Sequence, residues 1–272
     1  MFEDSIRFPF VLDAVLALAS LHRATSSPEK GQEYTSSSLY HESRGLQGYA
    51  EQLANITQDN CQAVFAFSML INVLTIAASV GFPGLPPVPP MDTLFAAFEL
   101  LRGIEVVWDA SSTMLVASPY GILFSQEKSC EGQEAIPDLT NAMQELHRRA
   151  GECQSDPWRA DIYHSTIDRL HEAFKEFQGS KNIGIIIAWP ILISSTAMDL
   201  LKEQDPIVLL IFIHYGVLYL QVHNRWWAYN FGVRLIRDLS KTLHAVDHIW
   251  LPYTRWARSK AARVSVIASD YS

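Results

Sequence analysis

The chain has 272 residues, of which 49% are hydrophobic and 18% are charged, and its formal net charge is −8 at pH 7. This composition supplies a large apolar core, and we expect one domain spanning residues 1–272. A negatively charged surface repels phosphate backbones, so direct binding to nucleic acid is not expected. Three cysteines without paired spacing fit neither a disulfide framework nor a zinc cluster. We therefore predict no metal and no cofactor, and an intracellular location.

The first third of the chain predicts three helices. Residues 8–22 begin with a proline near the helix start and are apolar around most of the circumference, which is typical of a central helix. Between residues 33 and 56, apolar side chains recur every three, four or seven residues, as on one face of a surface helix. A third helix, apolar nearly all round, is expected after Thr57, which is a suitable N-cap.

Residues 81–90 contain five prolines and two glycines, which predicts a loop because proline removes backbone donors and fixes φ. A further helix is expected after Asp92, with an apolar stripe that reaches Trp108. Residues 111–137 show no regular pattern and are interpreted as irregular.

The second half of the chain again shows helical periodicity and no sustained alternation, so no sheet is predicted. We expect an all-α fold of about eight to ten helices, without regular repeats, around an apolar core that could hold a ligand cavity. The expected helices of this half cover residues 138–150, 157–177, 189–202, 206–222 and 225–246.

Three apolar runs, residues 63–80, 183–193 and 207–222, have the composition of membrane helices. The first contains polar residues, the second is broken by Pro190, and the third is short against the roughly 20 residues that a span needs. Buried helices of a soluble protein explain the runs better, so no membrane span is predicted.

The stretch "HYGVLYLQVHNRWWAYNFGVRLI", residues 214–236, raises the question of a ligand pocket. His214 lies on an apolar helix, where a buried imidazole must find a hydrogen-bond partner. It is either a satisfied core histidine or a polar group that lines a pocket, and the dense aromatic residues nearby are either core or cavity wall. The candidate ligand-binding residues are Trp108, Trp189, His214, Tyr215, Tyr219, Trp226, Trp227 and Phe231.

No catalytic motif is present: the sequence contains neither a nucleophile elbow nor a glycine-rich phosphate loop. If the chain is an enzyme, acid and base chemistry would fall to His214, Tyr215, Asp109 or Glu105, since such groups become reactive when they are buried in a pocket.

Two local patterns near the C-terminus stay open to more than one interpretation. In "HAVDH", His244 and His248 could face one metal ion, but a third protein ligand is missing, so a solvated helix end is favoured. In "WARSKAARVSV" and the Arg255 that precedes it, the basic residues Arg255, Arg258, Lys260 and Arg263 indicate either a solvated helix face or a docking patch.

The order of segments along the chain resembles a known family. The segments "FPFVLDAVLALASLHRA", "LLRGIEVVWDAS" and "AWPILISSTAMDLLKEQDPIVLLIFIHYGVLYLQVHNRWWAYNFGVRLI" are similar to the C-terminal regulatory domain of fungal binuclear zinc-cluster transcription factors, in particular the sterol uptake control proteins. The resemblance implies an all-α effector domain, frequently dimeric, that holds a sterol-like ligand and couples its occupancy to cytosolic or nuclear residence and gene activation. The six closely spaced cysteines of that family do not precede Phe8.

Three functions therefore remain open. The first is a ligand-responsive regulatory domain of a fungal transcription regulator, which works as a homodimer and binds a sterol-like or other apolar small molecule. The second is an enzyme of fungal secondary metabolism, an isomerase or cyclase built on the same scaffold. The third is a dimerisation or co-regulator module without a ligand, whose cavity would be filled by its own side chains.

Overall fold

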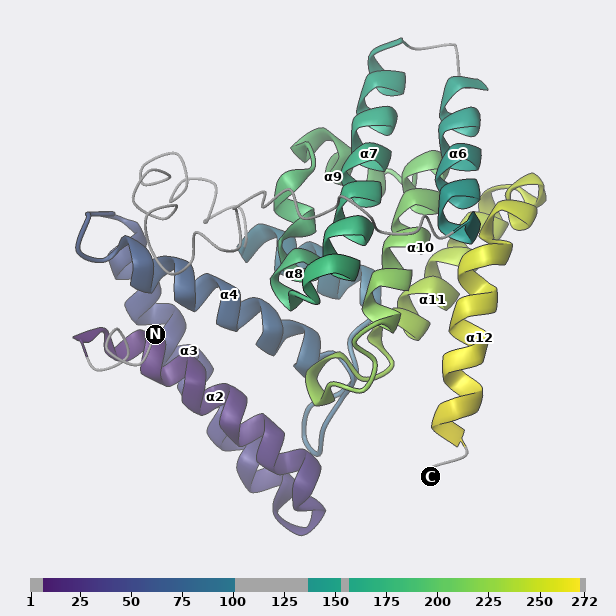
Figure 1. Cartoon of the computed structure of the whole chain (residues 1–272). Coiled ribbons are helices and arrows are strands. Elements are labelled where there is room, and N and C mark those ends of the chain that lie inside the picture. The colour runs from purple at the N-terminus through teal and green to yellow at the C-terminus, as the bar shows by residue number, and fades with distance from the viewer. Residues whose placement is uncertain (1–6, 101–136, 153–156, 270–272) are drawn as a thin grey trace. The chain divides into compact units, whose positions relative to one another are not determined.

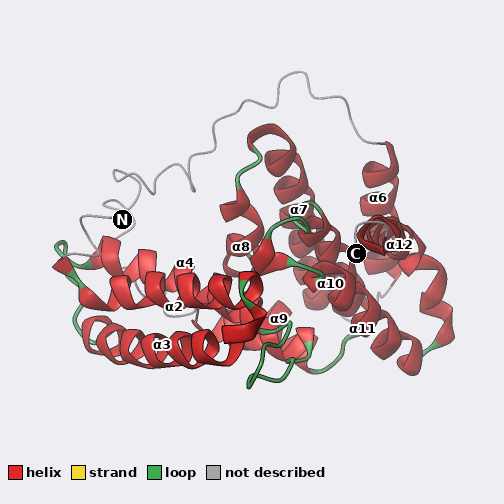
Figure 2. Ribbon diagram, turned by 90° about the horizontal axis from the view of Figure 1, so that it is seen from below, coloured by secondary structure: helices red, strands yellow, loops and turns green. Residues whose placement is uncertain are grey.

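The computed structural model describes residues 7–100, 137–152 and 157–269. In these residues 84% of positions are helical and no strand occurs, so the all-α prediction is confirmed (Figure 2). The chain forms two compact units. Unit 1 contains the described residues up to 100 together with 225–229, and unit 2 contains those from 137 to 224 and from 230 onward. That residues 1–272 form one domain stays a prediction.

Unit 1 is built on a hairpin of α2 (Pro9–Ser26) and α3 (Gly31–Leu53), which lie side by side and are joined by the short helix η1 (Pro28–Lys30) (Figure 1). The helix α4 (Cys61–Ala78) packs on α2 and α3. In its core the Phe67 ring lies 5.4 Å from the Phe10 ring and 4.7 Å from the Tyr49 ring, measured between centroids. These three rings thus join α2, α3 and α4.

The start of α4 corrects the expected cap. The helix begins at Cys61 with Asn60 as its N-cap residue, not Thr57. The two residues bond each other: the Thr57 amide donates to Asn60 Oδ1 at 2.7 Å, and the Asn60 amide donates to Thr57 Oγ1 at 3.3 Å. Thr57 therefore closes the turn before the helix.

Within the described residues, α4 is long and apolar enough to cross a bilayer, and 67% of its 18-residue window is buried in the protein. Burial of this kind is typical of the core helix of a globular unit. The expectation of no membrane span stays a prediction.

Two further segments complete unit 1. Residues 81–89 form a loop, as their prolines predict, and residues 90–100 are helical. The short helix η3 (Trp226–Ala228) joins this unit by contacts with α2 and α4.

Unit 2 surrounds the helix α10 (Pro206–Leu220), whose side chains from Ile207 to Leu220 are all buried. A helix that is apolar all round needs neighbours on every side, and α10 contacts most other elements of its unit. The other elements of unit 2 are α6 (Pro137–Glu152), α7 (Pro157–Ser180), α8 (Ile183–Leu192), α9 (Ser195–Lys202), α11 (Phe231–Val246), η4 (His248–Thr254) and α12 (Arg255–Ser269).

Two expected helices of this half have different bounds. The helix predicted over residues 189–202 is two helices, because Ile193 is extended and Ser194 caps α9 by accepting a hydrogen bond from the Thr196 amide at 3.1 Å. The helix predicted from residue 225 begins only at Phe231, because Asn230 adopts a left-handed conformation with φ 57°. Asparagine tolerates that conformation better than most residues, and it ends the preceding turn.

Candidate functional site

Four of the predicted ligand-binding residues pack against one another in the core of unit 2. Trp189 stacks on Tyr215 at 4.3 Å between ring centroids, Tyr215 contacts Tyr219 edge-on at 5.3 Å, and Tyr219 contacts Phe231 at 4.8 Å. All four side chains are buried. These four rings pack against one another between α8, α10 and α11. We call them the aromatic cluster.

The hydroxyl groups of the aromatic cluster are also engaged. Tyr215 donates a hydrogen bond to the Ile186 carbonyl oxygen at 2.7 Å. Burial raises the pKa of both Tyr215 and Tyr219 well above the ordinary value, so neither phenol ionises near neutral pH. The geometry gives Tyr215 a structural role.

The remaining predicted residues do not join this cluster. Trp226 and Trp227 belong to unit 1, where the Trp226 ring stacks on His22 at 4.8 Å. Trp108, Glu105 and Asp109 lie outside the described residues.

His214 leaves α10 on a different side from its neighbour Tyr215. Its imidazole stacks on the indole of Trp256, with centroids 5.4 Å apart and planes inclined by 11°. The two rings form part of the wall of an open groove of about 590 Å³ in unit 2. The wall also includes Asp138, Ala142 and Leu146 from α6, Tyr253 from η4 and Ser259 from α12. We call this hollow the His214 groove.

The tautomer of His214 follows from its one hydrogen bond. Nδ1 lies 2.8 Å from the Leu210 carbonyl oxygen, and because a carbonyl only accepts, Nδ1 carries the proton. A neutral imidazole has a single N–H group, so Nε2 holds a lone pair, and it has no hydrogen-bond partner among the described residues. Burial lowers the pKa of His214 to about 4, with the bond to Leu210 opposing the shift. The side chain is 2% exposed and neutral at physiological pH.

This shift predicts how the stability of unit 2 depends on pH. The pKa of His214 falls from 6.5 in the unfolded chain to about 4 in the folded one, so below pH 6.5 the unfolded state binds the extra proton. The stability contributed by neutral His214 is therefore present above pH 6.5 and is lost as pH falls to 4, by up to about 3 kcal/mol. Urea unfolding between pH 4 and 7 measures this slope, and His214→Asn should flatten it. An identical slope in the variant would contradict the assignment.

Trp256 offers the second unsatisfied polar atom at this place. Its indole Nε1 is buried and has no hydrogen-bond partner in the described part of the chain. An indole N–H only donates, whereas His214 Nε2 only accepts in its neutral form. The stacked pair thus combines an apolar surface with one free donor and one free acceptor. The donor, Trp256 Nε1, is buried without a partner, and such an atom calls for an explanation.

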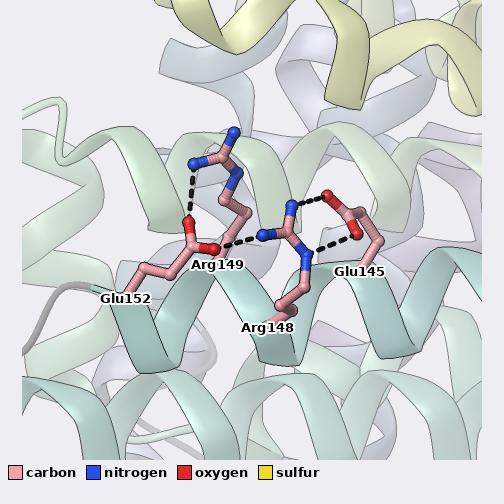
Figure 3. A network of polar contacts seen from close by, with 4 residues as sticks. All are labelled: Glu145, Arg148, Arg149 and Glu152. Carbon is pink, nitrogen blue, oxygen red and sulfur yellow. Dashed lines mark hydrogen bonds and ion pairs between the residues drawn. The ribbon is translucent and has the colours of Figure 1, made fainter.

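Charged residues of α6 stand beside the groove in a paired network (Figure 3). Arg148 donates through Nε to Glu145 at 2.9 Å, and it also donates to Glu152. Glu152 accepts a second hydrogen bond from Arg149 at 2.7 Å. The hydrogen bonds from Arg148 lower the pKa of Glu145, which lines the groove. On the same rim, Lys260 pairs with Asp138 at 3.4 Å. Both carboxylates of the rim are therefore neutralised.

The sequence interpretation missed Trp256, since the charges around it dominate the segment. A signal was present: Trp256, Ala257 and Ala261 are apolar positions among the basic residues of this stretch, and both alanines are buried. Their spacing indicates one buried face of α12, with Trp256 beside it.

Histidine pairs occur elsewhere in unit 2. His147 Nδ1 lies 2.8 Å from His164 Nδ1, and His244 Nδ1 lies 3.1 Å from His248 Nδ1. Among the described residues no group of three or more His, Cys, Asp or Glu side chains is arranged to hold a metal ion.

Comparison with protein-family models, curated proteins and solved structures gives no match to this chain.

Proposed function

We propose that the chain is a ligand-responsive regulatory domain that binds a chiefly apolar small molecule in the His214 groove and thereby controls a fungal transcription regulator. The observation that carries the binding part is His214, a residue that lines a groove of about 590 Å³. Its imidazole is neutral and buried, and its Nε2 has no hydrogen-bond partner among the described residues. Ligand sites are commonly apolar hollows of this size with a few polar groups that fix orientation.

The energetics of such binding are reasonable. Burying about 200 Å² of apolar ligand surface contributes roughly 5 kcal/mol at 25 cal/mol per Å². A hydroxyl or N–H group that donates to His214 Nε2 adds about 1 kcal/mol and fixes the orientation. A sterol-like molecule with one hydroxyl group meets both requirements.

The regulatory part rests on the order of the segments along the sequence. In the resembling family, the effector domain responds to a ligand, frequently dimerises, and acts in the nucleus and cytoplasm. We propose the same for this chain, acting as a homodimer without direct contact to nucleic acid, as its net charge of −8 favours. The groove supports this function over that of a co-regulator module without a ligand.

The test is to identify what the groove holds. Mass spectrometry of organic extracts from the purified protein should detect an apolar molecule, and its amount should fall at least fivefold in His214→Asn. Asparagine can still donate to the Leu210 carbonyl but lacks the acceptor at the Nε2 position. The matched control is His223→Asn. The His223 ring also bonds a backbone carbonyl, that of Leu220, at 2.7 Å. His223 does not line the groove. No bound molecule, together with no binding of added sterols at micromolar concentrations, would contradict the proposal.

One observation favours the enzyme alternative, an isomerase or cyclase. A neutral imidazole with a free Nε2 lone pair is the form that a general base needs. An isomerase of this kind exchanges substrate hydrogen with solvent, so incubation with metabolite extracts in deuterated water should label a compound in the presence of the protein but not of His214→Asn. If no compound gains deuterium, this alternative is contradicted.

A further inference from the structure

A second hollow shares part of its wall with the His214 groove. This hollow, of about 480 Å³, is lined by Leu251, Pro252, Arg255, Arg258 and Ser259, and three of these residues also line the His214 groove. Arg255 is one of the three and thus lines both hollows. A ligand with its apolar part against Trp256 can therefore extend toward Arg255.

The charges at this junction are not balanced. Arg148, Arg149 and Lys260 each have a carboxylate partner. The Arg255 amide donates to the Pro252 carbonyl oxygen, but the side chains of Arg255 and Arg258 form no hydrogen bond or ion pair with any described residue. Two unpaired guanidinium groups thus lie together on a chain whose net charge is −8. A local positive field on an acidic chain indicates selection of an anion.

We propose that the ligand of this site is an amphipathic carboxylic acid: a flat apolar body that stacks along Trp256, a hydroxyl or N–H group that donates to His214 Nε2, and a carboxylate that pairs with Arg255. The proposal rests on the proposed function and names its ligand class. A carboxylate matches the planar guanidinium fork, which can hold it by two parallel hydrogen bonds. Arg258, one helical turn along α12, strengthens the local field.

The size of the effect follows from exposure. Arg255 and Arg258 are exposed. Ion pairs at exposed sites contribute little, on the order of 1 kcal/mol, which corresponds to about a fivefold change in affinity. The contribution should weaken with added salt, since the Debye length falls to about 3 Å at 1 M.

Three matched probes separate the groups of the ligand. 6-Hydroxy-2-naphthoic acid carries the flat body, the donor and the carboxylate; its methyl ester lacks the anion; and 6-methoxy-2-naphthoic acid lacks the donor. By calorimetric titration of the full chain, we expect the hydroxy acid to bind about fivefold more tightly than the ester, and this preference to disappear in Arg255→Gln. Arg263→Gln is the control, because it removes the same charge from an exposed residue of α12 that does not line either hollow.

The outcomes separate this inference from the proposed function. If the acid and the ester bind equally well to both the wild-type chain and Arg255→Gln, the carboxylate assignment is overturned, while the groove still binds ligands. If the preference is lost equally in Arg263→Gln, the effect is one of net charge and the assignment is likewise overturned. If none of the three probes binds, the assigned ligand class is overturned, and titration with sterols decides separately whether the groove binds apolar molecules.

Discussion

Replacing Asp205 by alanine should lower the free energy of unfolding of unit 2 by about 3 kcal/mol. Asp205 is the N-cap of α10, where Oδ1 accepts hydrogen bonds from the amides of Ile207 at 3.0 Å and Val208 at 3.1 Å. Its second oxygen, Oδ2, accepts from the Tyr163 hydroxyl at 2.7 Å. Oδ2 also accepts from Arg159 Nη1 at 3.4 Å. Loss of a cap costs about 1 kcal/mol, and loss of the buried hydrogen bonds to Oδ2 costs about 1–3 kcal/mol more.

Urea unfolding monitored by circular dichroism measures this loss, and two variants divide it. Asp205→Asn keeps a good N-cap and should retain most of the cap contribution. Tyr163→Phe removes the hydroxyl that donates to Asp205. The double variant with Asp205→Ala loses this hydrogen bond only once, so it should be more stable than the sum of the single effects predicts. Additive effects would show that the two side chains do not depend on each other.

Replacing Gly232 by alanine should destabilise unit 2 by about 3 kcal/mol, at the upper end of the range for overpacking. Here α11 crosses α10 at close range. A Cβ atom on Gly232 would lie 2.7 Å from the Gly216 carbonyl oxygen and 3.0 Å from the Leu220 amide nitrogen. These are backbone atoms, which cannot move aside as a flexible side chain could, so the two helices would have to separate. Since the aromatic cluster spans the same two helices, the separation would also loosen the Tyr219 and Phe231 rings.

The matched control for this variant is Gly151→Ala in α6. A Cβ atom at that position meets no atom within 4 Å, and alanine is the better helix former. Thermal unfolding should therefore show a lower melting temperature for Gly232→Ala and an unchanged or higher one for Gly151→Ala. Equal melting temperatures for the two variants would contradict the close packing of α10 on α11.

Much of the fold could be predicted from the sequence, because its helices carry long, regular apolar patterns. The continuous apolar character of residues 207–220 correctly predicts a helix buried on all sides. The errors lie at helix ends, where local chemistry decides. The cap formed by Ser194 divides one expected helix, and the left-handed Asn230 delays the start of another by six residues.

The site was only partly predictable. Helical periodicity places Trp189 and Tyr215 on helices, but whether their rings face a cavity or each other depends on how α8 packs on α10, which no local pattern encodes. For His214 the sequence left two interpretations open, and the structure combines them: the backbone satisfies Nδ1, and the residue also lines the groove. Its stacking partner Trp256 lies 42 positions further along the chain and is brought near by the packing of α12.

The most direct test of the account is to locate a bound ligand by nuclear magnetic resonance with ¹⁵N-labelled histidine and tryptophan. On addition of 6-hydroxy-2-naphthoic acid, we expect the His214 Nε2 and Trp256 Nε1 signals to shift, while the indole signal of Trp189 in the aromatic cluster stays in place. Shifts of Trp189 without shifts of His214 and Trp256 would contradict the account, because they would place the ligand in the core and not in the His214 groove.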